Sequence, residues 1–183
     1  MAGGYLTVVG LEPFFHAWLE ETGALEAAWC RQAAEIRSIA EWIGLNQAIS
    51  AMKLAREARE ASATLGRRFL ELTVALTGDP ALRERAAAGC EVHLAAAFGC
   101  TGRALEAAPE IAAAAYLHQS LASLISACQR LLPLGQRQAS QLLWRLKPAI
   151  LAVAGNAEAT CFVPALEIAS MRHPLLSTRL FIS

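Results

Sequence analysis

Cysteine and histidine, side chains that often bind transition metals or act as nucleophiles, come close together at one place in this chain. Cys90 and His93 are three positions apart, so on a helix they would share one face and could hold a nickel or zinc ion. Two ligands do not complete such a site, and no Cys-x-x-Cys or His-x-x-x-His pair supplies the others. Because a buried cysteine beside a hydrogen-bonded histidine is commoner than a metal site, we predict that no metal is bound here.

Other catalytic arrangements are also missing from the sequence. There is no Gly-x-x-x-x-Gly-Lys-Ser/Thr loop to cradle nucleotide phosphates, no Gly-x-Gly-x-x-Gly turn after a strand and no Gly-x-Ser-x-Gly elbow for a nucleophilic serine. The histidines are far apart in the sequence and have no obvious acid or nucleophile beside them. We therefore predict that the chain binds other proteins and is not an enzyme. The four histidines are His16, His93, His118 and His173.

The overall composition limits the possible partners. The 16 basic and 16 acidic residues cancel, so no net field attracts a polyanion, and nucleic acid is not an expected partner. Apolar residues make up 55% of the chain and charged residues 17%, a balance that leaves apolar surface for another subunit or protein to cover. We therefore expect an oligomer or a complex.

Cysteine usage and hydropathy indicate the compartment. The five cysteines are odd in number, unevenly spaced and mostly in apolar surroundings, as expected for reduced thiols in the cytoplasm. No secretory signal is visible before Gly10. The uncharged stretch from Ile111 to Gln129 is nearly long enough to span a membrane, but His118 and several serines interrupt it, so a helix buried in a bundle is the better interpretation. We expect a cytoplasmic protein with no membrane segment.

The spacing of apolar residues predicts an all-α fold, a single multi-helix bundle over residues 1–183 with an extended C-terminal tail at about 164–183. Alternating strand patterns are nearly absent. Ser38 and Glu41 form a capping box, and Asp79 caps a short helix. The expected helices run from Glu12 to Gly23, from Ala24 to about Ala34, from Ser38 onward, from about Met52 to Thr77, from Asp79 to Gly89, from Cys90 to Leu105, from Pro109 to Pro133, and from Gln136 to about Ala154 with a disturbance at Pro148.

One of these expected helices, from about Met52 to Thr77, has the clearest amphipathic pattern in the chain. The helix from Cys90 to Leu105 is instead rich in alanine and glycine, which would let another backbone approach it closely. The apolar residues of the amphipathic helix recur at intervals of three and four, and they are Leu54, Ala58, Ala61, Leu65, Phe69, Leu72 and Leu76.

The predicted tail has an unusual composition. Arg172, His173 and Arg179 alternate there with apolar residues that need a cover. From composition alone, the tail either folds back on its own bundle or docks on another protein.

Five short motifs, each weak alone, occur in an order that is specific for one family. They are Glu57 to Ser62 with Gly66-Arg67, His93 with Phe98-Gly99, the uncharged helix ending in Leu132-Pro133-Leu134-Gly135-Gln136, Ala169 to His173, and Ser177 to Ser183. With them the chain resembles UreF, the family of urease accessory proteins, from about Gly4 to Ser183. Nothing like the family's opening L-P-x-G-x-F-x-x-S-x-G-L-E segment precedes Gly4, so the resemblance is to an N-terminally short member.

The resemblance implies an all-helical homodimer that joins UreD, also called UreH, and the GTPase UreG on apo-urease. GTP hydrolysis by UreG would drive nickel insertion, and nickel would only pass through the complex, with no cofactor held tightly by this chain. By residue matching, UreD would contact the tail at Arg172, His173, Arg179, Leu180 and Phe181. In the helix-ending motif, which includes Pro133, Gly135 would end the long helix and Gln136 would orient the next turn. The other residues matched to structural motifs are Glu57, Arg59, His93, Phe98 and Gly99.

Two other functions remain open at the level of the sequence. The chain could be a helical small-molecule sensor, because its large aromatic side chains could line a pocket between helices. A metal-dependent enzyme that uses Cys90 and His93 is the weaker alternative. The aromatic residues that could line such a pocket are Trp18, Trp29, Trp42 and Phe69.

Overall fold

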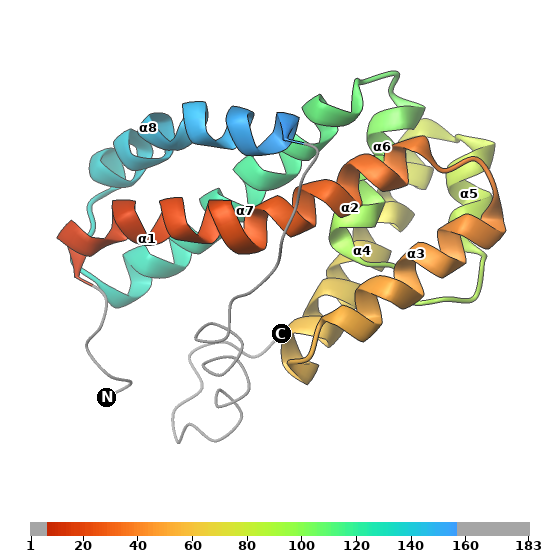
Figure 1. The fold of residues 1–183 in the computed structure, drawn as a ribbon, viewed down its shortest axis with the longest axis horizontal. Helices are drawn as coiled ribbons and strands as arrows, with labels where there is room; N and C mark the ends of the chain where they lie inside the picture. Colours follow the sequence, from red (N-terminus) through yellow and green to blue (C-terminus); the bar gives the residue numbers. More distant parts are fainter. Residues whose placement is uncertain (1–6, 157–183) are drawn as a thin grey trace.

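The computed structural model describes residues 7–156 of the chain, and within that range every regular element is a helix (Figure 1). The predicted all-α class is therefore confirmed. The predicted tail at 164–183 lies outside the described residues. The elements are a 3₁₀ turn at Val8–Gly10, α1 (Leu11–Trp18), a π-helical segment at Leu19–Gly23, α2 (Ala24–Glu35), α3 (Ile39–Met52), α4 (Arg56–Thr77), α5 (Pro80–Ala86), α6 (Leu94–Ala104), α7 (Pro109–Leu131) and α8 (Gln136–Gly155).

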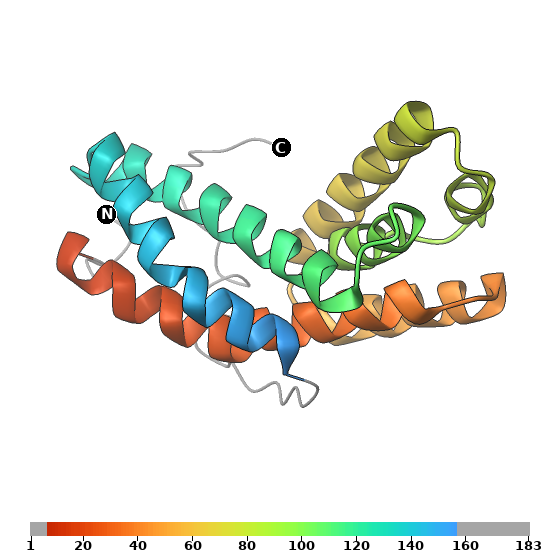
Figure 2. The ribbon, with the colours of Figure 1, turned by 90° about the horizontal axis from the view of Figure 1, so that it is seen from above.

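The first two predicted helices are joined, so the expected stop at Gly23 is wrong. The π-helical segment Leu19–Gly23 carries α1 directly into α2, and the two form one long rod (Figure 2). Gly23 is buried, and a Cβ there would lie 3.3 Å from Cδ2 of Leu117 in α7. A glycine costs a helix only about 1 kcal/mol, and the packing against α7 outweighs that local preference.

The rod has different neighbours along its length. Its first part, α1, lies beside α8, whereas the α2 part is packed against α6 and α7, with α3, α4 and α5 further out (Figures 1 and 2). The crossing of α2 and α6 is very close, because a Cβ added to Gly99 would lie 2.0 Å from the carbonyl oxygen of Cys30. The predicted close approach at the small residues of α6 is therefore confirmed.

Several helix ends follow their local sequence signals. Ser38 Oγ accepts a hydrogen bond from the Glu41 amide at 3.2 Å, and the Glu41 carboxylate accepts one from the Ser38 amide at 3.3 Å, which confirms the capping box. Gly78 ends α4 with a φ of 68°, a left-handed conformation that glycine adopts at little cost. Asp79 Oδ1 accepts from the Leu82 amide at 2.8 Å and starts α5 as predicted.

Two predicted helix starts are too early. The helix expected from Met52 begins at Arg56, because α3 itself runs to Met52 and a short link separates the two helices. The helix expected from Cys90 begins at Leu94. In the extended link before it, the amide of His93 donates to Asn46 Oδ1 at 2.8 Å, so a tertiary hydrogen bond takes the place of a helical one.

Three leucines of the apolar stripe of α4 do not face the core of this chain, although Phe69 of the same stripe packs against it. An amphipathic helix normally places that stripe inward, but Leu65, Leu72 and Leu76 are 51%, 55% and 75% exposed. The buried positions of α4 are Gly66, Leu70 and Thr73, on another side of the helix.

Two further features belong to α7 and α8. Pro148 lies inside α8 without ending it. Within the described part of the chain, α7 is the one helix whose length and apolar composition would suit a membrane span. Core helices pass the same test, and α7 is packed against α2, α6 and α8.

Candidate functional site

The extended link before α6 carries a histidine that joins three parts of the fold. His93 is fully buried. Its Nδ1 lies 3.2 Å from Ser62 Oγ on α4, and its Nε2 lies 2.8 Å from Ser50 Oγ on α3. Because the main chain of His93 is also bonded to Asn46, the residue fixes α3, α4 and the start of α6 relative to one another.

The neighbouring groups define a chain of hydrogen bonds through the imidazole. The Leu94 amide is 3.5 Å from Ser62 Oγ, so that hydroxyl accepts from Leu94 and donates to Nδ1 of His93. Nε2–H then donates to Ser50 Oγ, which lies 2.6 Å from a carboxylate oxygen of Glu91 and donates to it. This assignment needs a neutral ring, and burial, reinforced by the charge of Lys53, lowers the pKa of His93 below its usual value.

This constellation of Ser50, His93 and Glu91 differs from a nucleophilic triad. In a triad the carboxylate accepts from the second ring nitrogen and orients the base. Here Glu91 accepts from the serine hydroxyl, and the second ring nitrogen is bonded to Ser62. The arrangement holds helices together and does not activate a hydroxyl.

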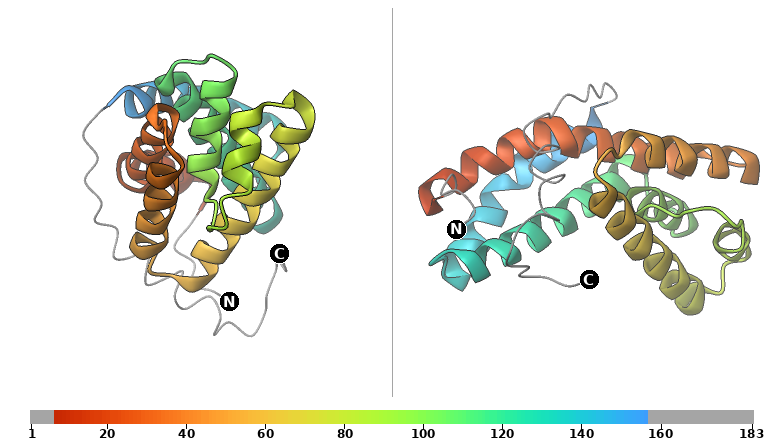
Figure 3. Two further views of the ribbon diagram at one scale, coloured as in Figure 1. Left: turned by 90° about the vertical axis from the view of Figure 1, so that its right-hand side faces the viewer. Right: turned by 90° about the horizontal axis from the view of Figure 1, so that it is seen from below.

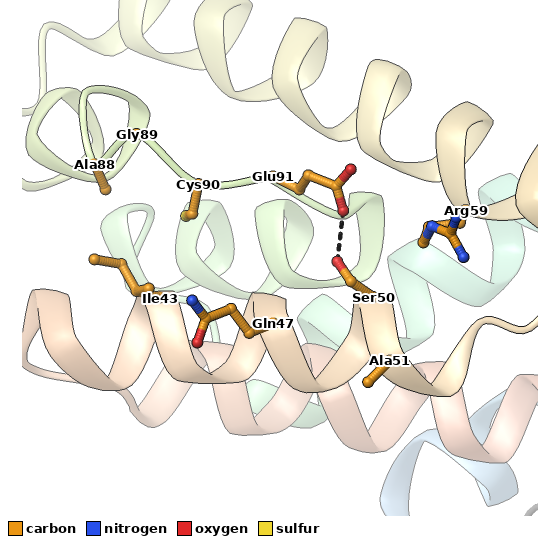
Figure 4. A pocket seen from close by; sticks show the side chains of 9 residues that line it. All are labelled: Ile43, Gln47, Ser50, Ala51, Arg59, Ala88, Gly89, Cys90 and Glu91. Carbon is orange, nitrogen blue, oxygen red and sulfur yellow. Dashed lines mark hydrogen bonds between the residues drawn. The ribbon is translucent and has the colours of Figure 1, made fainter.

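A shallow, open pocket of about 650 Å³ lies beside this histidine (Figure 4). Glu91 and Ser50 meet on one side of it, while Cys90 points toward Ile43 and Gln47. The premise that Cys90 and His93 share a helix face is therefore wrong, because both residues precede α6, Cys90 in a bend and His93 in extended backbone. Burial raises the pKa of the Cys90 thiol and keeps it protonated. Among residues 7–156 there is no group of three or more potential metal ligands.

The glycines of the recognised motifs mark places where two backbones touch. A Cβ on Gly66 would lie 2.1 Å from the carbonyl oxygen of Val92, in the same extended link that carries His93. Gly99 has the corresponding role between α6 and α2. Both positions exclude a side chain because backbone atoms, which cannot move aside, fill the space.

The charged motif residues lie at the start of α4. Arg59 Nη1 donates to the carbonyl oxygen of Lys53 at 3.2 Å, and so holds the link between α3 and α4. Glu57 lies half-buried in the first turn of the same helix.

Phe98 connects this region to a second polar cluster. Its ring stacks on Phe69 of α4 at 4.3 Å and meets Tyr116 of α7 edge-on at 5.5 Å. The Tyr116 hydroxyl donates to Glu26 at 2.7 Å, and Glu26 also forms a buried ion pair with Lys53. Burial raises the pKa of Tyr116 well above its usual value, so the hydroxyl remains a donor.

The remaining motif residues lie apart, at the turn between α7 and α8. The helix α7 ends at Leu131, so Gly135 does not end it and instead precedes α8, where its amide donates to Gln138 Oε1 at 3.1 Å. Gln136, the first residue of α8, accepts from Gln129 at 3.0 Å across the turn. Pro133 is exposed between them.

The aromatic residues considered for a sensor pocket are also separated. The ring of Trp29 faces the Lys53 ammonium, and the ring of the buried Trp42 faces the Arg85 guanidinium. Phe69 stacks on Phe98. Trp18 lies on α1 and packs against the core. None of the four lines the pocket beside Ser50 or the smaller one between α1 and α8. They are core side chains of different helices.

Some contacts were not expected from the sequence. The partners Ser50, Asn46 and Glu26 were missed, although a polar residue in an otherwise apolar helical run is a signal of a buried hydrogen bond. The residues predicted to contact UreD lie outside the described residues; they are Arg172, His173, Arg179, Leu180 and Phe181.

These observations define the class of the protein. It is an all-helical protein in which buried polar side chains form hydrogen bonds that link one helix to another.

The sequence model of the family UreF matches residues 8–147. Relatives named urease accessory protein UreF are 28% identical in Geobacillus kaustophilus, over 93% of this chain and 78% of the relative, and 33% identical in Paracoccus denitrificans, over 91% and 78%. One from Corynebacterium efficiens is 30% identical, over 96% and 80%.

The chain therefore belongs to the UreF family, as the five motifs predicted. This is a family of urease accessory proteins and not of enzymes, so the chain is not an enzyme.

Proposed function

We propose that this protein is the scaffold that holds UreD and the GTPase UreG on apo-urease while GTP hydrolysis drives assembly of the nickel centre. The observation that carries the proposal is the match to the UreF family over residues 8–147. In this scheme nickel is cargo that passes through the complex in the cytoplasm, and the GTPase partner supplies the phosphate-binding loop that this sequence lacks.

Partner binding is also supported by exposed apolar side chains. Three leucines on α4 and Trp144 with Leu151 on α8 are at least half exposed, and apolar side chains that gather on a surface are typical of interaction sites. The tail residues Arg172, His173, Arg179, Leu180 and Phe181 are proposed as the contact with UreD, because they pair cationic with apolar side chains.

The test is co-elution of the full chain with UreD from the same organism on a sizing column, without GTP. We expect one complex with the unchanged chain and its loss with Arg179→Ala. Arg137→Ala is the matched control, because Arg137 is an exposed arginine at the start of α8, and it should leave the complex intact. Failure of the unchanged chain to bind UreD would rule out the scaffold role.

A further inference from the structure

The outer side of α8 carries an exposed row of side chains, here called the α8 row, that is both apolar and basic. Trp144 is 69% exposed and Leu151 is 61% exposed. Exposed Arg137 lies seven positions before Trp144, and Leu151 lies seven positions after it, so the three follow one line along the helix. Pro148 is exposed beside this line. At 1.5 Å per residue the row is about 21 Å long.

The α8 row faces away from the other described helices. The buried side of α8 packs against α1, α2 and α7. Figure 2, seen from above, shows α8 in front of α1 and α7, and the right-hand view of Figure 3, seen from below, shows it behind them. The row is therefore accessible along its whole length to another molecule.

The largest side chain of the row is held by a neighbour. The ammonium of Lys147 lies 3.9 Å from the centroid of the Trp144 ring, a cation–π contact that favours one orientation of the ring. A tryptophan that is already oriented loses less side-chain entropy when a partner covers it. Tryptophan is also among the residues that contribute most to the affinity of protein–protein interfaces. Trp144 is therefore suited to be the centre of a contact.

The charges of α8 specify the chemistry of that contact. Between Gln136 and Gly155 the helix has no acidic residue, and its charged residues are Arg137, Arg145 and Lys147. Arg145 is paired with Glu12. Arg137 and Lys147 form no ion pair within residues 7–156. Two unpaired cations beside an exposed tryptophan are complementary to a surface that carries carboxylates.

We propose that the α8 row binds a segment of a partner protein that presents carboxylates beside apolar side chains. The apolar side chains of the partner cover Trp144 and Leu151, and its carboxylates pair with Arg137 and Lys147. This assignment rests on the proposed function. Because the tail is the proposed contact with UreD, the row is assigned to an acidic segment of a different protein of the same complex.

A protein fits this row better than a lipid surface or a nucleic acid does. Segments that bind anionic lipids carry clusters of about four to eight lysines and arginines, whereas the row has two unpaired cations. The chain as a whole has no net charge, so it adds no long-range attraction to a polyanion. Apolar contact must therefore supply most of the affinity, and the two charges select an acidic partner.

The test begins with the complex of the full chain and UreD held on a sensor surface, to which purified UreG and purified apo-urease are added in turn. We expect Trp144→Ala to raise the Kd of one of these two proteins by about thirtyfold, the scale of a residue at the centre of an interface. Leu105→Ala is the matched control, because Leu105 is 62% exposed at the end of α6, and it should change neither Kd. Helical circular dichroism should be equal in all three chains.

Charge variants test the acidic character of the partner. Lys147→Glu should raise the same Kd by about tenfold, because like charges then meet. Lys147→Arg should keep it within about threefold, since arginine retains the charge and also stacks on aromatic rings. Arg83→Glu reverses an exposed cation on α5 and should have no effect. Tighter binding by Lys147→Glu would contradict an acidic partner.

Several results would overturn the assignment. If Trp144→Ala leaves both Kd values unchanged, the row is not a contact with either protein. If Trp144→Ala loses UreD, the row belongs to the UreD contact, and if light scattering shows a smaller particle for this variant alone, a second copy is the occupant. Binding of the unchanged chain to phosphatidylglycerol vesicles that is lost in Trp144→Ala would assign the row to a membrane.

The same measurements separate this inference from the proposed function. An unchanged complex with UreD that binds neither UreG nor apo-urease refutes the scaffold role, and the assignment of the row with it. An unchanged complex that binds them, together with a Trp144→Ala complex that binds them equally well, refutes the assignment alone.

Discussion

Two ion pairs, each between a basic side chain and a glutamate carboxylate, lie in different regions of this molecule. Lys53 and Glu26 are 15% and 7% exposed and meet where α2, the end of α3 and α7 come together. Arg145 and Glu12 are 52% and 38% exposed and cross from α8 to α1 at the surface. The first pair is desolvated and the second is screened by water, so we expect the fold to depend on the first alone.

The same contrast extends to the two regions as a whole. Around α3, α4 and α6, polar groups such as His93, Ser50 and Ser62 bond helix to helix. Between α1, α7 and α8 the buried side chains are apolar, as Phe15 and Leu146 are. A polar network fixes one relative position of its helices, whereas apolar packing tolerates small shifts.

Among these predictions, Lys53→Met should cause the largest loss of stability. It leaves the Glu26 carboxylate buried without its cation, and unfolding should become easier by about 3 kcal/mol, at the lower end for a broken buried pair. Urea denaturation followed by circular dichroism measures this loss. Adding Glu26→Gln to the same chain should recover most of it, because the uncompensated charge is gone. No loss in the single variant would mean that water reaches this pair.

Gly99→Ala tests the close crossing of α2 and α6 and should cost about 2–3 kcal/mol, in the range of overpacked sites. The added Cβ would lie 2.0 Å from the Cys30 carbonyl oxygen, so two helices must separate. Gly44→Ala in α3 is the control, because no atom lies within 4 Å of its added Cβ. That change should stabilise the helix by about 0.5–1 kcal/mol. Equal thermal stability of the two variants would contradict the close contact between α2 and α6 at Gly99.

Acidification should weaken the polar region first. The pKa of His93 is lowered by burial and by Lys53 and Arg59, against the opposing charges of Glu91 and Glu26. The unfolded chain then binds a proton that the folded chain does not, so stability falls as the pH drops below the ordinary histidine pKa of 6.5.

Urea denaturation at pH 7.5, 6.5 and 5.5 measures this effect. His93→Gln should flatten the profile in that range while lowering stability throughout. Glu41→Gln is the control, because hydrogen bonds from the backbone amides of Arg37 and Ser38 lower the pKa of Glu41 from 4.5, and its contribution is lost at lower pH. An unchanged slope in His93→Gln would show that His93 is not responsible.

The features that could be predicted from the sequence are local. The caps at Ser38 and Asp79 depend on neighbours within four residues, and the sequence predicts both. Gly23 was misread because its environment is set by Leu117, far along the chain. The partners of His93 are 31 and 43 positions away, beyond any local pattern.

The amphipathic pattern of α4 shows a different limit of prediction from sequence. Periodicity reveals that a helix has an apolar row, but it does not say which surface covers that row. Leu72 and Leu76 belong to the predicted row and are exposed, while Leu70 and Thr73, outside it, are buried.

Arg145→Met should change stability least. It removes the exposed ion pair in the same way that Lys53→Met removes the buried one. Arg145 Nε donates to both carboxylate oxygens of Glu12, at 3.0 and 3.1 Å, and this contact lowers the pKa of Glu12. Since water and salt screen both side chains, we expect no measurable change in the denaturation midpoint at physiological ionic strength. A loss comparable to that of Lys53→Met would mean that α1 and α8 are held by this pair and not by their apolar faces.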